Sequence, residues 1–237
     1  MAEKRVTIIA SCHVFDLKEK MTSIIEEIKP ECVCLELDEG RFERLKSGDV
    51  QESPLSNLQR DIAGIYGAKP GNDMLGAVIG AESVKAEIML IDEEIEKVME
   101  KIKKALSSIA ISQLFGSILS DKDESKKSDL VEKVMGAHDI HSLVELLVQS
   151  FEEDPDSYRE MLSQHFPQLT KILLDEREEF MFRGLEYALS KHDRAVAVVG
   201  AGHVNALKKR LESIGVDVDT VPVSDVRRWG MKKIGVS

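Results

Sequence analysis

The sequence predicts an α/β protein with a central sheet, mostly parallel or mixed, that is built from both ends of the chain and flanked by helices. Two observations lead to this prediction. Short, nearly continuous apolar runs occur near both ends of the chain, whereas residues 93–192 have helical periodicity and no convincing strand. Continuous apolar runs are typical of strands that helices cover on both faces, as in parallel sheets. We therefore expect one domain, with residues 1–92 and 193–237 as its α/β core and residues 93–192 as a helical insertion.

Three strands and the helices between them are predicted in the first part of the chain. The strands cover residues 5–10, 32–37 and 88–91, and a helix between the first two ends at Pro30. That helix carries an apolar stripe formed by Leu17, Met21, Ile24, Ile25 and Ile28. Residues 55–86 also have a helical pattern, but glycines interrupt it at positions 64, 67, 71, 76 and 80. We expect two helices there, broken by these glycines, with a loop at residues 69–71 between them.

The predicted insertion begins with a long amphipathic helix over residues 93 to about 116. Its apolar stripe is formed by Ile95, Val98, Met99, Ile102, Leu106 and Ile109, and Leu114 and Phe115 extend it. Later segments are also amphipathic and could cover this stripe within one chain, but a long apolar face also invites packing against a second copy. We expect a homodimer. Beyond the insertion, strands at residues 195–199 and 216–221 flank a helix that Gly215 ends.

Composition and charge narrow the classes of partner and location. The chain has 237 residues, of which 43% are hydrophobic, enough to fill a globular core. Its formal net charge is -11, from 43 acidic and 32 basic residues without a basic patch, which argues against nucleic-acid binding. The three cysteines lack disulfide or zinc spacing, and the sequence shows neither a signal segment nor an apolar run of membrane-spanning length. We expect a cytoplasmic protein.

A strand followed by three small residues, a His and a Val occurs twice. The first copy covers residues 7–14 and contains His13, and the second covers residues 197–204 and contains His203. The carboxyl ends of parallel strands meet at one edge of a sheet, where α/β proteins bind their ligands. Imidazole binds metal ions and transfers protons near neutral pH. Each histidine alone could be structural, but the matching pair predicts one shared site.

Acidic residues follow two of the predicted strands. Strand alternation places Glu36 and Asp38 on the face opposite Leu35. An acid in an apolar strand is costly to bury unless it meets a cation, a metal ion or hydrogen-bond donors. Either Arg41 forms a local structural ion pair with Glu36, or Glu36 serves the histidine site. Asp92, after the third strand, either lies at the same edge or caps the following helix.

Four segments of the chain resemble the TraB/PrgY family of pheromone-shutdown-like proteins. They are residues 34–45 (CLELDEGRFERL), 74–82 (MLGAVIGAE), 173–178 (LLDERE) and 198–204 (VVGAGHV), in the order that the family has them. By its spacing alone, the third segment would be a solvated helix face. The family is related to the Tiki Wnt-cleaving proteases and, more distantly, to the GumN, erythromycin-esterase and ChaN groups. Ala10 stands where the family usually has Gly in the first motif, and Asp92-Glu93 where an Asp-Arg pair is commoner.

The resemblance implies a metal-dependent peptidase site made of two Gly-x-x-His motifs, a Glu and Arg residues. We expect His13, His203 and Glu36 to bind a divalent ion, Mn²⁺, Co²⁺ or Zn²⁺, and we expect catalytic roles for Glu36, Arg41, Glu176 and Arg177. The substrate would be a peptide or a related acyl compound. The alternative is a non-catalytic protein that sequesters a peptide or another ligand, which would also explain pheromone shutdown. Family members often continue into membrane helices, so membrane association is expected only if Ser237 is a truncation.

Overall fold

The computed structural model describes residues 4–12, 16–47, 71–107, 159–160, 163–164 and 166–230. Its strands are β1 (Arg5–Ser11), β2 (Cys32–Leu35), β3 (Glu87–Leu90), β4 (Arg194–Gly200) and β5 (Asp217–Val221). Its helices are α1 (Lys18–Ile28), α2 (Glu39–Ser47), α4 (Asn72–Val84), α5 (Ile95–Ser107), α10 (Pro167–Thr170), α11 (Glu176–Lys191), α12 (Ala201–Ser213) and α13 (Val223–Arg228). A π-helical turn, η1 (Lys171–Asp175), joins α10 to α11. No helix in these ranges is long and apolar enough to cross a membrane.

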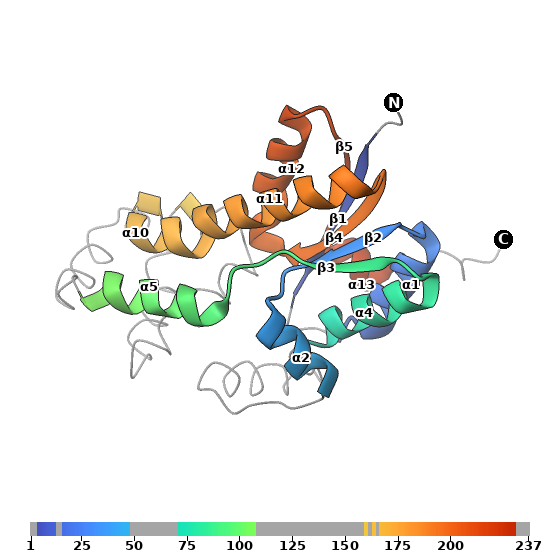
Figure 1. Ribbon diagram of the computed structural model, residues 1–237, viewed down its shortest axis with the longest axis horizontal. Helices are drawn as coiled ribbons and strands as arrows, with labels where there is room; N and C mark the ends of the chain where they lie inside the picture. Colours follow the sequence, from blue (N-terminus) through green and yellow to red (C-terminus); the bar gives the residue numbers. More distant parts are fainter. Residues whose placement is uncertain are drawn as a thin grey trace.

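The five strands form one parallel sheet in the order β3-β2-β4-β1-β5. Strands from the two ends of the chain alternate in it, since β4 lies between β2 and β1 (Figure 1). In the register, Ser11 at the end of β1 lies opposite Gly200 at the end of β4. The predicted α/β class, with a sheet built from both ends of the chain, is confirmed.

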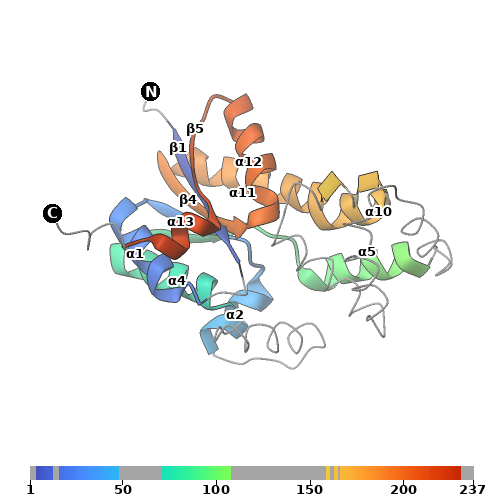
Figure 2. The same cartoon turned by 180° about the vertical axis from the view of Figure 1, so that it is seen from behind.

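Helices cover both faces of the sheet, as Figures 1 and 2 show from opposite sides. Helices α11 and α12 pack on one face, where their buried apolar residues meet Ile8, Cys34 and Ala197. Helices α1, α4 and α13 pack on the other face against Ile9 and Val33. The continuous apolar runs of the central strands follow from this burial on both sides.

Glycines in α4 allow it to pack very closely on α1. A Cβ atom built on Gly76 would lie 2.2 Å from the carbonyl oxygen of Lys18, and one on Gly80 would lie 2.9 Å from the Cβ of Ile25. The hydroxyl of Thr22 donates a hydrogen bond to the carbonyl oxygen of Gly76 at 2.9 Å. Helix α4 directly follows Gly71 and is the second of the two helices expected on either side of the loop at residues 69–71, with Gly76 and Gly80 inside it. The first of the two expected helices lies outside the described residues.

The described part of residues 93–192 is helical, with two different kinds of packing. Helix α5 contacts α10 and η1, and Figures 1 and 2 show α5 and α10 extending together to one side of the sheet. Val98 and Ile102 of the predicted α5 stripe are buried there. Helix α11 instead packs on the sheet through Met181 and Leu185. The stripe beyond Ser107, with Ile109, Leu114 and Phe115, lies outside the described residues.

Candidate functional site

The carboxyl ends of β2, β3 and β4 bring Glu36, Asp92 and Gly200 to one edge of the sheet. Glu36 is the first residue after β2, and its N–H donates to the carbonyl oxygen of Val198 in β4 at 3.1 Å. Its Oε2 accepts a hydrogen bond from the N–H of Gly200 at 2.6 Å. Gly200 directly precedes α12, so the positive end of that helix dipole also lies beside the carboxylate. The local backbone therefore favours the ionised form of Glu36.

Arg177 binds the acids that follow β2 and β3. Its Nη2 donates to Glu36 Oε1 and, at 2.6 Å, to Asp92 Oδ2, and its Nε donates to Asp92 Oδ1 at 3.0 Å. The Arg177 side chain is 14% exposed and that of Asp92 is fully buried. Arg177 is the second residue of α11, directly after η1, and such π-helical turns are frequent at functional sites. Helix α11 thereby joins two strand ends across the sheet edge.

Arg41 lies in the same network, but its partners differ from those considered from the sequence. Its Nε donates to Asp38 Oδ2 at 2.6 Å and its Nη2 donates to Asp92 Oδ2 at 2.7 Å. The local Glu36–Arg41 ion pair is therefore wrong as an account of Glu36, whose guanidinium partner is Arg177. Capping of the following helix by Asp92 is also wrong, because Asp38 Oδ2 accepts from the N–H of Ile95 where α5 begins. Asp92 accepts instead from the adjacent N–H of Glu93 and from both arginines.

His203 points one ring nitrogen at each of two carboxylates. Its Nδ1 lies 3.2 Å from Glu178 Oε1 and its Nε2 lies 3.6 Å from Glu36 Oε1. The residue is 5% exposed. Glu178 is held in turn by Arg159, whose Nη1 and Nη2 donate to its two oxygens at 2.6 and 3.0 Å. The ionised Glu178 favours a proton on Nδ1, which leaves Nε2 facing Glu36.

Burial and charge act against each other on the pKa values of these acids. Burial alone would raise the pKa of Asp92, but Arg177 and Arg41 hold it well below its usual value. Burial likewise opposes ionisation of Glu36, and His203 in its charged form, Arg177 and the Gly200 N–H act in the other direction and lower its pKa. The three carboxylates of Glu36, Asp92 and Glu178 are therefore ionised near neutral pH.

The network of described residues carries an excess of negative charge. Three buried carboxylates and the partly buried Glu36 meet three guanidinium groups: Asp38, Asp92, Glu178 and Glu36 against Arg41, Arg159 and Arg177. Arg159 also binds the half-exposed Asp175, so negative charge remains in excess among them. A protonated His203 or a bound cation would balance it, since buried charge is costly without compensation.

Two of the three metal ligands expected from the sequence lie together at this edge of the sheet. Among the described residues no group of three or more His, Cys, Asp or Glu side chains is placed to hold a metal ion. Two of the three expected ligands, Glu36 and His203, do face each other, and 3.6 Å is compatible with both atoms binding one ion at about 2.0 to 2.2 Å. The third, His13, lies outside the described residues, two positions beyond Ser11. Glu36 and His203 alone are therefore two donors of the kind that a divalent ion takes, and a complete site would need a further ligand.

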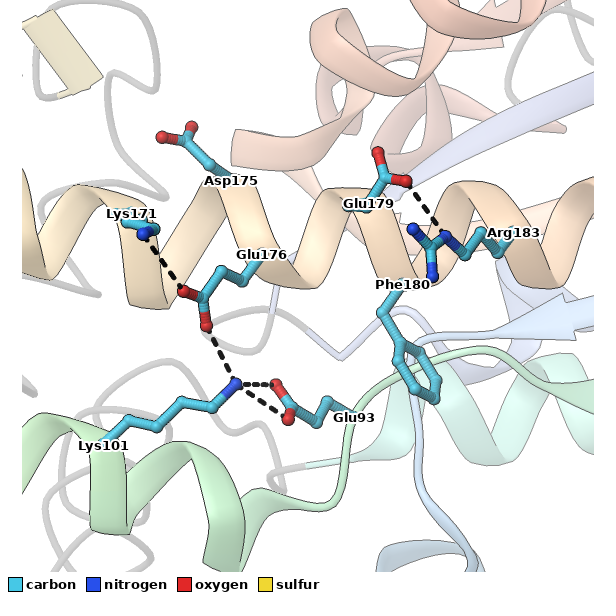
Figure 3. A pocket seen from close by; sticks show the side chains of 8 residues that line it. All are labelled: Glu93, Lys101, Lys171, Asp175, Glu176, Glu179, Phe180 and Arg183. Carbon is cyan, nitrogen blue, oxygen red and sulfur yellow. Dashed lines mark hydrogen bonds and ion pairs between the residues drawn. The ribbon is translucent and has the colours of Figure 1, made fainter.

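The fourth expected catalytic residue, Glu176, lies away from this cluster, in a pocket of about 490 Å³ beside α5 and α11 (Figure 3). Its carboxylate accepts a hydrogen bond from the Lys101 ammonium at 2.8 Å and lies 3.9 Å from the Lys171 ammonium. Lys101 also binds both oxygens of Glu93, as the dashed lines in Figure 3 mark. Within this pocket Glu176 therefore pairs with lysines, and it makes no contact with Glu36 or His203 in the described part of the chain.

Sequence reasoning missed Glu178, which contacts His203 directly, and Arg159, which holds Glu178. A signal for Glu178 was present in the helical spacing, since it falls in register with the buried residues Leu174, Met181 and Leu185. An acid in the apolar stripe of a helix needs a buried partner. Only the carboxylate-rich surroundings of this position suggested a solvated face.

The fold and site define an α/β protein in which carboxylates, arginines and a histidine converge at the carboxyl edge of a parallel sheet. The chain belongs to the TraB/PrgY/gumN family, whose family model matches residues 2–219. It is 26% identical over 253 aligned residues to the uncharacterized protein MJ1365 of Methanocaldococcus jannaschii. That alignment covers 97% of this chain and 60% of the relative, so the chain spans less than two thirds of that protein's length.

Proposed function

We propose that the chain is a metal-dependent hydrolase of a peptide or a related acyl substrate, with Mn²⁺, Co²⁺ or Zn²⁺ bound by Glu36, His203 and His13. The observation that supports it most is the pairing of His203 with two carboxylates, Glu178 at 3.2 Å and Glu36 at 3.6 Å. A carboxylate that accepts the second N–H of a metal-binding histidine is the usual outer partner of such ligands. We further propose a cytoplasmic homodimer that does not bind nucleic acid.

The roles of the chain's own residues follow from their positions. A bound divalent ion would lower the pKa of a water molecule and polarise the substrate carbonyl. Glu36 would bind the ion or accept a proton from the attacking water at Oε1, the oxygen that faces His203. Arg177, within reach of Glu36, would stabilise negative charge that develops on the substrate oxygen. Arg41 would hold Asp92, and Asp92 would hold Arg177 in place.

The rival proposal is a protein that sequesters a peptide or another ligand without cleaving it. It is favoured by the engagement of both Glu36 oxygens, one by Arg177 and the other by the Gly200 N–H. A carboxylate with donors on both oxygens and a lowered pKa is a weak proton acceptor. Ligand binding through charge would need no such acceptor.

Product formation separates the two proposals. The protein is incubated with a diverse peptide library and Mn²⁺, Co²⁺ or Zn²⁺, and the peptides are analysed by mass spectrometry. Hydrolase activity predicts new termini that disappear in Glu36→Gln and persist in Glu212→Gln, which alters an exposed acid on α12. Saturable binding of peptides that stay intact would select the sequestering protein and overturn the hydrolase.

A further inference from the structure

Strand β3 forms one edge of the sheet, and every second residue of it points its backbone N–H and C=O groups outward, away from β2. The N–H groups of Glu87 and Ile91 point toward β2 and its flanks, where they donate to the carbonyl oxygens of Glu31 at 2.9 Å and Leu35 at 3.0 Å. Because backbone groups alternate in direction along a strand, the N–H and C=O of Ile88 and Leu90 point outward. Within the described ranges, β2 is the only strand that pairs with β3.

A groove runs along this outward edge. Its volume is about 480 Å³, and it is lined by β3 itself, by Phe42 of α2, and by Gly184, Tyr187 and Lys191 of α11. Figure 1 shows β3 passing between α11 and the side of the molecule that carries α2 and α4. The groove is open to solvent on the side of Tyr187, because that residue is 55% exposed. Every open sheet has edges, but here the edge is the floor of a groove with an aromatic side chain in each wall, Phe42 on one side and Tyr187 on the other.

The groove leads to the candidate site. Its lining reaches Ile91, and the next residue, Asp92, binds both Arg41 and Arg177. The lining carries two acids, Glu39 and Glu87, and one base, Lys191, and Glu87 is paired with His192 at 2.8 Å, so the groove has no strong charge of one sign that would favour an acidic or a basic polymer. An extended chain with apolar side chains and free backbone groups matches these features better than a compact small molecule.

We propose that an extended peptide segment binds along the outer edge of β3 as an added strand, through the backbone groups of Ile88 and Leu90. Phe42 and Tyr187 flank the side chains of that segment. The inference names the substrate class of the proposed hydrolase and rests on that proposal for its functional meaning, but peptide binding is measured separately from cleavage. β3 spans four residues, about 13 Å, so a short segment suffices to cover the edge.

The test uses a library of acetylated, amidated nonapeptides, with EDTA present so that cleavage does not interfere. Retained peptides are measured by affinity selection and mass spectrometry on the wild type, Ile88→Pro and Thr220→Pro. Proline at position 88 removes an outward N–H while leaving the bonds to β2 intact. Thr220→Pro is the matched control, because Asp217 in β5 donates inward to Lys4 and alternation turns the Thr220 N–H outward on the opposite edge. Circular dichroism melting checks that both variants are folded.

We expect Ile88→Pro to weaken retention at least about tenfold and Thr220→Pro to leave it unchanged. On the wild type, the retained peptides should slow amide hydrogen exchange at Ile88 and Leu90, without slowing it at Val218 and Thr220. No retention by the wild type, equal retention by Ile88→Pro, or unchanged exchange at Ile88 and Leu90 would each overturn the inference. Peptides that bind at β3 but are never cleaved when metal is restored would support the inference and count against the hydrolase alone.

Discussion

Arg177 lies where three parts of the chain meet, because it is on α11 and binds the acids that follow β2 and β3. Buried charges of this kind are costly to remove from water, and their geometry decides whether mutual attraction offsets that cost. Here the guanidinium makes hydrogen bonds through two nitrogens and each acid has a second partner. Removal of any one of Arg177, Glu36 and Asp92 would therefore leave a buried charge without its partner.

Replacement of Arg177 by Met should destabilise the fold, because Glu36 and Asp92 would lose a buried counter-charge. We expect the free energy of unfolding to fall by about 3 to 5 kcal/mol in urea denaturation. Arg183→Met is the matched control, since the Arg183 side chain is 74% exposed and pairs with Glu179 one turn away. It should leave stability almost unchanged. An Arg177→Met protein as stable as the control would contradict the described network.

Asp92 should make stability depend on acid pH. Its pKa is lowered in the folded state by Arg177 and Arg41, so below about pH 4 the unfolded chain binds a proton that the folded chain does not. The contribution of Asp92 is therefore present above that pH and is lost as the pH falls toward its folded pKa. Unfolding measured from pH 6 to pH 3 should show a shallower decline for Asp92→Asn than for the wild type. Parallel curves for the two proteins would show that Asp92 is not held ionised. Asp219→Asn serves as the control, because the Asp219 side chain is exposed on the edge strand β5.

At the scale of elements, the contact between α1 and α4 depends on the missing side chain of Gly76. Its Cβ position lies 2.2 Å from a backbone atom, the carbonyl oxygen of Lys18, which cannot move without moving the helix. The glycines of α4 therefore allow its close packing on α1, although glycine lowers the stability of an isolated helix.

Gly76→Ala should force the two helices apart and lower the free energy of unfolding by about 1 to 3 kcal/mol, despite the better helix propensity of alanine. Ile79→Ala alters the exposed side of the same helix and is expected to have little effect. Thermal melting of both variants is the measurement. A Gly76→Ala protein that melts at or above the wild-type temperature would show that the helices are not in this close contact.

The elements differ in how far the sequence could predict them. Apolar periodicity located all five strands to within two residues, because burial on both faces leaves a strong local pattern. The convergence of Glu36, Asp92 and His203 at one edge followed from the parallel arrangement. The family resemblance placed Arg177 in this site, but the residues around Glu36 could not show that Arg177 binds it rather than Arg41, because Arg177 is 141 positions away and its placement depends on how α11 packs. Gly76 shows the same limit, since only the tertiary contact with α1 distinguishes a helix breaker from a packing glycine.

For the whole molecule, the homodimer stays a prediction, but the described part of the apolar stripe does not support it. Val98 and Ile102 of that stripe are buried within the chain and are not available to a second copy. A dimer would therefore need a different surface or the part of the stripe beyond Ser107. Sedimentation velocity at micromolar concentration should give the mass of two chains, and a monomer mass would contradict the prediction.

Metal binding by His203 and Glu36 is the central claim about the molecule, and calorimetric titration with Mn²⁺, Co²⁺ and Zn²⁺ tests it most directly. We predict one ion per chain for the wild type and an affinity at least about 100-fold lower for His203→Ala and Glu36→Gln. His192→Ala, which removes a histidine paired with Glu87 at the other end of the sheet, should bind like the wild type. A wild type that binds none of the three ions, or folded His203→Ala and Glu36→Gln proteins that bind them normally, would contradict the account.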